Sequence, residues 1–209
     1  MTLDTSSKEE YLDIQKEILN LAQRTLSKEE ISLAEEISIG LVSSKKKKEN
    51  ARLKIRNIVG VKPSRHLFYA NADLRFLPRY TRNPIRYLGD YIDHLVKFLS
   101  SEINGEKFLT KSLGINLKQL KGKIEENLRL KLVDYNNFCY VPAKHDFNLN
   151  GRKHRFTAKE AVYIAMLTIT LSKAILINSS KGRDYSDGRI NDDWAKMQYS
   201  PDNQDSLCD

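Results

Sequence analysis

Cysteine, glycine and proline are all scarce in this sequence. Its 209 residues include only 2 Cys, 9 Gly and 5 Pro. Cys139 and Cys208 are too few for a disulfide framework, which favours a reducing compartment. A β-sandwich needs more turn residues, whereas 40% hydrophobic and 30% charged residues with so little Gly and Pro are typical of a helix-rich fold.

The motifs of the familiar enzyme classes are missing too. There is no phosphate-binding glycine loop, no Gly-x-Ser-x-Gly elbow, no His-Glu-x-x-His and no Cys-x-x-Cys. The N-terminus has neither a basic start nor an apolar run, so no secretory signal is expected. The most apolar segment, Ala161 to Ile177, includes Thr168, Ser172 and Lys173 and favours a buried helix over a membrane span. We expect a cytoplasmic protein that has no cofactor and enters no membrane.

Positive charge dominates, but it is unevenly placed. The net charge is +8. From Asp184 to Asp209, seven Asp stand against Arg189 and Lys196, so this tail carries −5 and the remainder +13. A body this basic attracts polyanions, nucleic acid first and anionic membrane surfaces second, and an acidic tail competes for the same surface. Ordinary solubility charge is the alternative.

Three capping boxes predict where helices start. In each, a Glu follows a Ser or Thr by three residues, so that both side chains satisfy exposed amides: Ser7–Glu10, Ser27–Glu30 and Thr157–Glu160. Apolar residues at three- and four-residue steps follow the first two boxes, and we expect these helices to form a hairpin. The third box opens the apolar helix over Ala161–Ile177.

Two further helices are expected in the middle of the chain. The apolar period predicts one from about Asn83 to Glu102, with Pro84 in its first turn. Another is expected from an N-cap at Asn116 to near Tyr140, where Pro142 stops it. With the apolar C-terminal helix, these give three long helices around one core.

The predicted fold class is therefore all-α: a helical bundle with an N-terminal hairpin. Residues 1–60 are assigned to the hairpin and a basic segment, and residues 61–178 to a helical core domain. Residues 179–209 are rich in Ser, Asp, Asn and Gly and are expected to be a disordered acidic tail.

Histidine and positive charge coincide before the last helix. Lys144 and His145 begin this segment, and four basic residues end it: Arg152, Lys153, His154 and Arg155. Histidine titrates near neutrality and helix starts favour anions, so such a loop can hold a phosphodiester and move protons. The alternative is a solvated loop whose histidines hydrogen-bond to hold its shape.

A second cluster lies on one helix face at four-residue spacing, formed by Arg82, Arg86, Asp90 and His94. Its Arg side chains either contact phosphate or form structural pairs with the carboxylate. Asp90 and His94 together with His145 or His154 have the ligand types of a metal site, but no distance between them is fixed, and we expect no metal.

A third cluster is the lysine run Lys45, Lys46, Lys47 and Lys48, which opens a basic segment extending to Arg56. The segment is either a short helix or a linker. Its cations either form a solvated helix face or contact phosphates. Phosphate contacts would position nucleic acid without reading its sequence.

The order of these parts resembles the HEPN superfamily, small helical domains of which many are RNA-cleaving toxins or defence effectors. The likeness lies in the helix that starts at Arg82 and in the run from Tyr135 to His145, which precedes a last apolar helix; it covers at most Leu77 to Ile177. In active members an Arg with a polar neighbour precedes a His, and dimerisation joins two such motifs. Here Asn137 and its neighbour stand in place of the Arg.

The resemblance implies His145 and Asn137 as catalytic residues and a homodimer as the assembly. We therefore expect an RNA-binding protein, RNA being favoured over DNA, that is a metal-independent ribonuclease of toxin or defence type. The alternative is a non-catalytic helical module that binds a protein partner through residues 1–42, or nucleic acid through its basic body. An enzyme acting on a small phosphorylated ligand is a third alternative.

Overall fold

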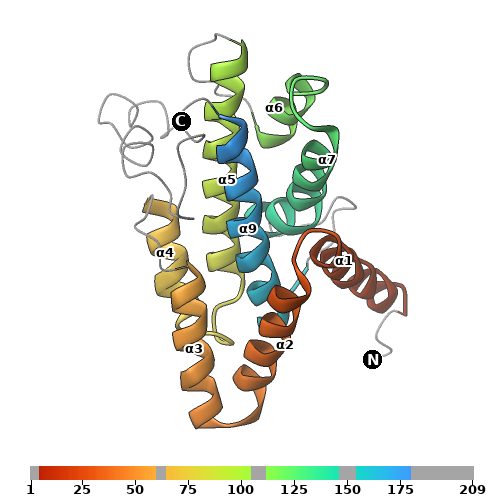
Figure 1. Cartoon of the computed structure of the whole chain (residues 1–209). Helices are drawn as coiled ribbons and strands as arrows, with labels where there is room; N and C mark the ends of the chain where they lie inside the picture. The colour runs from red at the N-terminus through yellow and green to blue at the C-terminus, as the bar shows by residue number, and fades with distance from the viewer. Residues whose placement is uncertain (1–4, 60–64, 105–111, 146–153, 180–209) are drawn as a thin grey trace.

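The structure, a computed structural model, describes residues 5–59, 65–104, 112–145 and 154–179. Every regular element in these ranges is helical, which confirms the all-α prediction (Figure 1). In chain order the elements are α1 (Thr5–Gln23), α2 (Lys28–Ser43), α3 (Lys45–Val59), α4 (Arg65–Leu74), α5 (Arg82–Asn104), α6 (Leu113–Gln119), α7 (Glu126–Asp134), a π-helical turn η1 (Tyr135–Tyr140), α8 (Val141–His145) and α9 (Ala158–Asn178).

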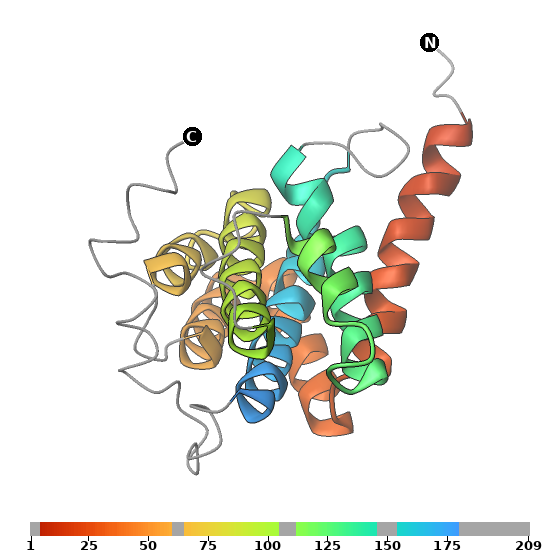
Figure 2. The ribbon, with the colours of Figure 1, turned by 90° about the horizontal axis from the view of Figure 1, so that it is seen from above.

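The centre of the molecule is the pair α5 and α9, which lie side by side (Figure 1). Seen from above, α3 and α4 lie on one side of this pair, and α6, α7 and α1 lie on the other (Figure 2). A single cluster of buried apolar side chains runs through the helices from Ile14 in α1 to Leu176 in α9. The N-terminal helices therefore share the core of the central pair.

The second capping box forms as predicted at the start of α2. The Glu30 amide donates to Ser27 Oγ at 3.2 Å, and the Ser27 amide donates to Glu30 Oε2 at 2.8 Å. The first helix begins at Thr5, so Ser7 lies within α1 instead of capping it.

The basic segment is a helix, α3, and it forms the close N-terminal pair with α2. Gly40 makes this approach possible, because a Cβ there would lie 3.0 Å from the Lys47 carbonyl oxygen and 3.2 Å from Ala51 Cβ. An ion pair between Lys54 and Glu36 joins the two helices across their exposed side.

The expected helix from Asn116 to Tyr140 is wrong at both ends. Gly122 adopts φ +71°, a left-handed conformation that ends a helix, so the apolar stripe is divided between α6 and α7, and Asn116 is buried inside α6 instead of capping it. Pro142 does not end the helix either, because the helical run continues through α8 to His145.

The π-helical turn explains how Pro142 is accommodated. Proline in a regular α-helix clashes with the carbonyl four residues earlier. Directly before Pro142 the helix widens, and the Val141 amide bonds to the Asn136 carbonyl, five residues back. Pro142 then occupies the first turn of α8, where its missing N–H costs little.

Several predictions fall outside the described residues. These are the disordered tail over 180–209, the domain boundary near residue 60 and residues 146–153 of the loop predicted between Lys144 and Arg155. The division into 1–60 and 61–178 stays a prediction.

The apolar C-terminal helix is confirmed as α9. Among the described helices it is the one long and apolar enough to cross a membrane, and 72% of its most apolar stretch is buried against the rest of the protein. A buried core helix passes the same test of length and composition, so this is weak support for a membrane span.

Candidate functional site

His145 is exposed at the last residue of α8, and the end of that helix is held by α5. Arg82, the first residue of α5, donates from Nε to the Ala143 carbonyl at 2.8 Å and from a terminal nitrogen to the Lys144 carbonyl at 3.5 Å. A cation on the last carbonyls satisfies groups that have no partner within the helix and complements the helix dipole. Arg82 thus fixes the backbone that presents His145.

Tyr140 anchors the same helical run to the middle of α5. Its hydroxyl donates to Asp90 Oδ1 at 2.6 Å and accepts from Lys144 Nζ at 3.0 Å. The Lys144 ammonium also lies 5.0 Å from the centroid of the Tyr140 ring. Burial and the Asp90 carboxylate raise the Tyr140 pKa far above its ordinary value, so the phenol stays protonated and donates.

Gly89 provides the space for that ring. A Cβ at this position would lie 2.0 Å from Tyr140 Cδ2 and 2.6 Å from Cγ, so the ring rests directly on the α5 backbone. The hydrogen bonds of the Tyr140 hydroxyl with Asp90 and Lys144 depend on this close packing of the ring against α5. One chain of contacts therefore leads from Gly89 through Tyr140 to Lys144, the neighbour of His145.

Next to this anchor, α5 buries two titratable groups. Asp93 Oδ2 is 3.0 Å from Lys97 Nζ, and burial raises the Asp93 pKa. The His94 ring stacks on His66 of α4 with centroids 5.0 Å apart. Burial, followed by the positive charges of His66, Lys97 and Lys144, lowers the His94 pKa to about 3, so this imidazole is neutral at physiological pH.

The stripe predicted on α5 is therefore divided by its surroundings. Arg82 and Asp90 join the anchor of α8, whereas His94 is buried against α4. Arg86 is half-buried, with its guanidinium 5.1 Å from the Tyr87 ring centroid. Among the residues that the structure describes, no group of three or more His, Cys, Asp and Glu could hold a metal ion.

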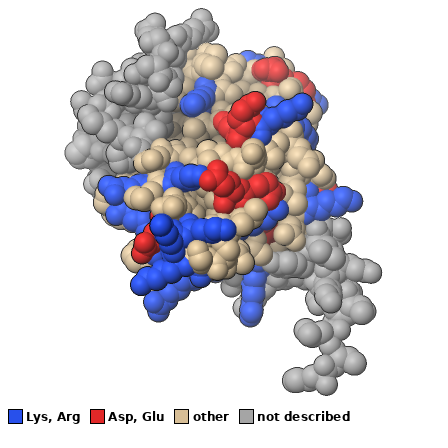
Figure 3. Space-filling model, turned by 60° about the horizontal axis from the view of Figure 1, so that its bottom comes forward, with Lys and Arg blue, Asp and Glu red and all other residues tan. Residues whose placement is uncertain are grey.

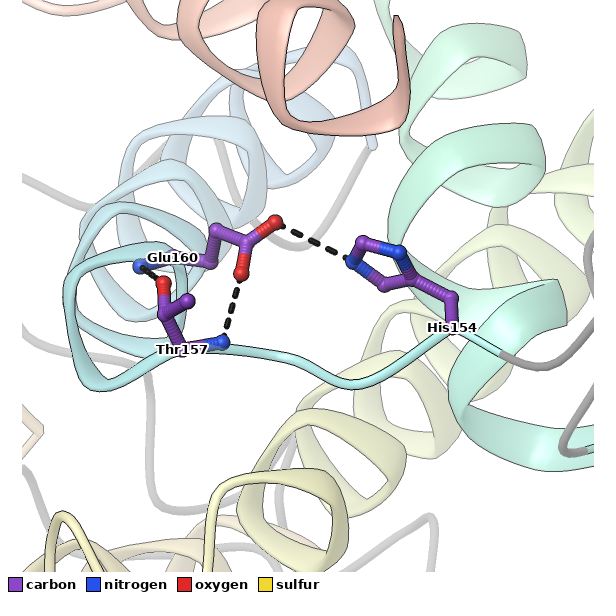
Figure 4. Close-up of polar contacts among 3 residues, drawn as sticks. All are labelled: His154, Thr157 and Glu160. Carbon is purple, nitrogen blue, oxygen red and sulfur yellow. Dashed lines mark hydrogen bonds and ion pairs between the residues drawn. The ribbon is translucent and has the colours of Figure 1, made fainter. Parts of the chain in front are cut away.

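His154 is buried and shapes the start of α9, as Figure 4 shows. Its Nε2 lies 3.1 Å from Glu160 Oε1, while Glu160 Oε2 accepts the Thr157 amide at 2.5 Å. The Glu160 amide donates to Thr157 Oγ1 at 3.2 Å, which completes the predicted capping box. The arrangement matches the alternative in which a histidine holds the loop in shape.

Asn137 lies in the π-helical turn, where its Oδ1 accepts from Asn136 Nδ2 at 3.0 Å. It precedes His145 by eight residues of one continuous helical run, or roughly 12 Å along the axis. The two predicted catalytic residues thus lie on the same rod, about two turns apart. Arg152 and Lys153 fall outside the described residues, and Arg155 is exposed.

Lys45, Lys46, Lys47 and Lys48 lie in the first turn of α3, where Ser44 Oγ accepts the Lys47 amide at 3.2 Å. Figure 3 shows Lys and Arg side chains gathered on this end of the molecule, at the bottom of Figure 1. The N-terminus of a helix carries partial positive charge, so a lysine run there opposes helix stability. The same place attracts anions strongly.

Two parts of this surface were missed by the sequence predictions. For the packing of the Tyr140 ring against Gly89, the sequence gives no signal except a glycine inside an apolar stripe. The second part is a set of exposed rings on α4 and the following turn, for which the alternation of aromatic residues with Arg between Arg75 and Arg82 was a usable signal.

In comparisons with known proteins, no family model, no curated protein and no solved structure matches this chain. The site must therefore be interpreted from its own geometry.

Proposed function

We propose that the protein binds RNA and cleaves it without a metal ion, as a HEPN-like ribonuclease, with His145 as a catalytic residue. The observation that supports this most directly is the exposed imidazole at the end of α8, which Arg82 holds in place through the adjacent carbonyls. An accessible histidine on a rigid element suits proton transfer, because its reach and direction are fixed before the substrate arrives.

The chemistry needs few groups, because RNA contains its own nucleophile. The ribose 2′-oxygen attacks phosphorus and loses its proton to a base, and the bond between phosphorus and the 5′-oxygen breaks as an acid protonates that oxygen. His145 supplies one of these two proton transfers, and the second copy of the chain in a homodimer supplies the other. Arg82, Lys144 and Arg155 supply positive charge for the phosphate oxygens.

The decisive experiment incubates single-stranded RNA with purified protein in EDTA and compares the wild type with His145→Ala. We expect cleavage to fall by at least about 100-fold, the usual contribution of a general acid or base, while RNA affinity changes by less than about twofold. Lys118→Ala, an exposed cation on α6, is the control. A rate that His145→Ala leaves unchanged removes this residue from the mechanism.

A second function, a non-catalytic module that binds a protein partner, is supported by the outer side of α2 and α3. Ile39, Val42 and Leu53 are each more than half exposed there, and Ile39 lines a groove between the two helices. Deleting residues 1–42 would also remove Ile18 and Leu21 from the core, so a surface change is the better test. This function is supported if the wild type co-purifies with a stoichiometric partner and does not cleave RNA, and if Val42→Asp loses that partner.

A further inference from the structure

The outer side of α4 and the turn that follows it expose aromatic rings. Phe68 is 58% exposed, Tyr69 37%, Phe76 54% and Tyr80 44%. The opposite side of α4 already supplies the core, with Leu67, Ala70 and Leu74 buried. The buried contact of α4 is therefore made by other residues, although Tyr69 also contacts Tyr87 of α5, and the exposed area of the rings is available for a ligand.

These rings form two groups, one on α4 and one in the turn that follows it. Tyr69 lies between Phe68 and Tyr87, with ring centroids 5.8 Å and 5.4 Å away. Phe76 contacts Tyr80 edge to face at 6.3 Å. Neighbouring rings at these distances limit one another's motion, so their faces are partly ordered before any ligand binds.

Arginine side chains lie among the rings. The Arg79 guanidinium is 5.4 Å from the Tyr80 centroid, and that of Arg86 is 5.1 Å from the Tyr87 centroid. Between Leu74 and Gly89 the chain has four Arg and no Asp or Glu. The surface thus combines flat apolar faces with an excess of positive charge, partly offset by Asp73 of α4, which interacts with Arg86. This combination fits a flat ligand joined to anions.

The surface also leads to His145. Tyr80 precedes Arg82 by two residues, so their Cα atoms are at most about 7 Å apart. Arg82 in turn contacts the Lys144 carbonyl, one residue before His145. A chain of nucleotides bound across the rings can therefore reach the exposed imidazole.

We propose that this aromatic–arginine face, formed by Phe68, Tyr69, Phe76 and Tyr80 with Arg75 and Arg79, binds unpaired nucleotides of single-stranded RNA; the proposal rests on the RNA-binding function above. Bases stack on the exposed rings, and the arginines contact the phosphates between them. A duplex keeps its bases paired and stacked inside, so it cannot use the rings. The substrate class is then single-stranded RNA, or the unpaired loops and ends of folded RNA.

The test uses full-length protein and two probes, a fluorescein-labelled 12-nucleotide RNA without internal pairing and the same strand annealed to its complement. Phe68→Leu and Phe76→Leu remove exposed rings but keep apolar side chains. Leu130→Ala removes a comparably exposed apolar side chain on α7 and is the matched control. Affinities are measured by fluorescence anisotropy, and folding by thermal unfolding.

We expect Phe76→Leu to weaken single-strand binding by at least about fivefold, the lower end for one stacked base, and to leave duplex binding and thermal unfolding unchanged. If the wild type binds the single strand and the ring variants bind it with the same affinity as Leu130→Ala, the stacking face is wrong but the RNA-binding function stands. A wild type that binds neither probe overturns both. Ring variants that change only the oligomeric state show that the face joins two copies of the chain, which also overturns the proposal.

Discussion

Gly89 is the residue where a single methyl group has the largest predictable effect. In Gly89→Ala the new Cβ would meet the buried Tyr140 ring at 2.0 Å, and the ring would have to leave its seat on α5. Overpacking costs about 1–3 kcal/mol and more when the contact is this short, which outweighs the roughly 1 kcal/mol that Ala gains over Gly within a helix. We expect the midpoint of thermal unfolding to fall by several degrees, at about 2–4 °C per kcal/mol.

Gly114→Ala is the control for this prediction. Its Cβ would meet only Asn136 Nδ2, at an ordinary 3.7 Å, so the unfolding midpoint should stay the same or rise slightly. In the background of Tyr140→Leu, which removes the ring, Gly89→Ala should lose most of its effect. Equal midpoints for the wild type and Gly89→Ala would contradict the close packing of Tyr140.

Between elements, the interface of α4 and α5 should make stability depend on pH. His94 has a pKa of about 3 in the folded protein against an ordinary value of 6.5, so between these values only the unfolded chain binds the proton. The free energy of unfolding must then decrease as pH falls from about 6.5 towards 3, by about 1.4 kcal/mol per unit for this group. Asp93 acts in the opposite direction, because burial raises its pKa and protonation favours its folded form.

His94→Gln separates the two contributions, since its side chain has no charge at any pH. Urea unfolding between pH 6.5 and 4 should show a slope that is smaller by about 1.4 kcal/mol per unit than in the wild type. Asp93 remains in both proteins, so its titration contributes to both slopes. Parallel slopes would mean that His94 is protonated in the folded state.

The elements differ in how well their sequences predict them. The capping boxes of α2 and α9 and the period of α5 are local signals, and the structure has these helices as predicted. The run from Asn116 to His145 was mispredicted because two local exceptions decide it: Gly122 breaks the apolar stripe, and the π-helical turn lets the helix pass Pro142. Neither exception can be predicted from the spacing of apolar residues or from the usual helix-breaking effect of proline.

At the scale of the whole molecule, packing decides what each basic or histidine residue can do. His145 and His154 look alike in sequence, but one is exposed at a helix end and the other is buried against Glu160. Arg82 and Arg86 share a helix face, yet only Arg82 reaches the carbonyls of α8. Arg82 differs from Arg86 because it contacts Ala143, 61 residues away, which no local pattern encodes. His154 differs from His145 because it contacts Glu160, six residues further along the chain.

The charge of the whole molecule leads to a last prediction, in which stability and RNA binding change in opposite directions. Lys45 and Lys46 lie in the first turn of α3, where the helix dipole opposes positive charge. The double change Lys45→Gln and Lys46→Gln should therefore stabilise the protein by about 0.3–1 kcal/mol per residue. If these lysines contact phosphates, the same variant should bind RNA more weakly and with less dependence on salt.

The pair Lys118→Gln and Lys121→Gln is the matched control, because it removes equal charge from exposed positions at and beyond the end of α6. For single-stranded RNA each lost phosphate contact lowers the slope of log affinity against log salt concentration by about 0.7, so the α3 variant should lose up to about 1.4 and the control little. Equal losses in the two variants would mean that net charge alone attracts RNA. If the α3 variant is more stable but the salt dependence of its RNA affinity is unchanged, the lysine run serves solubility. RNA binding would then belong to the surface around His145.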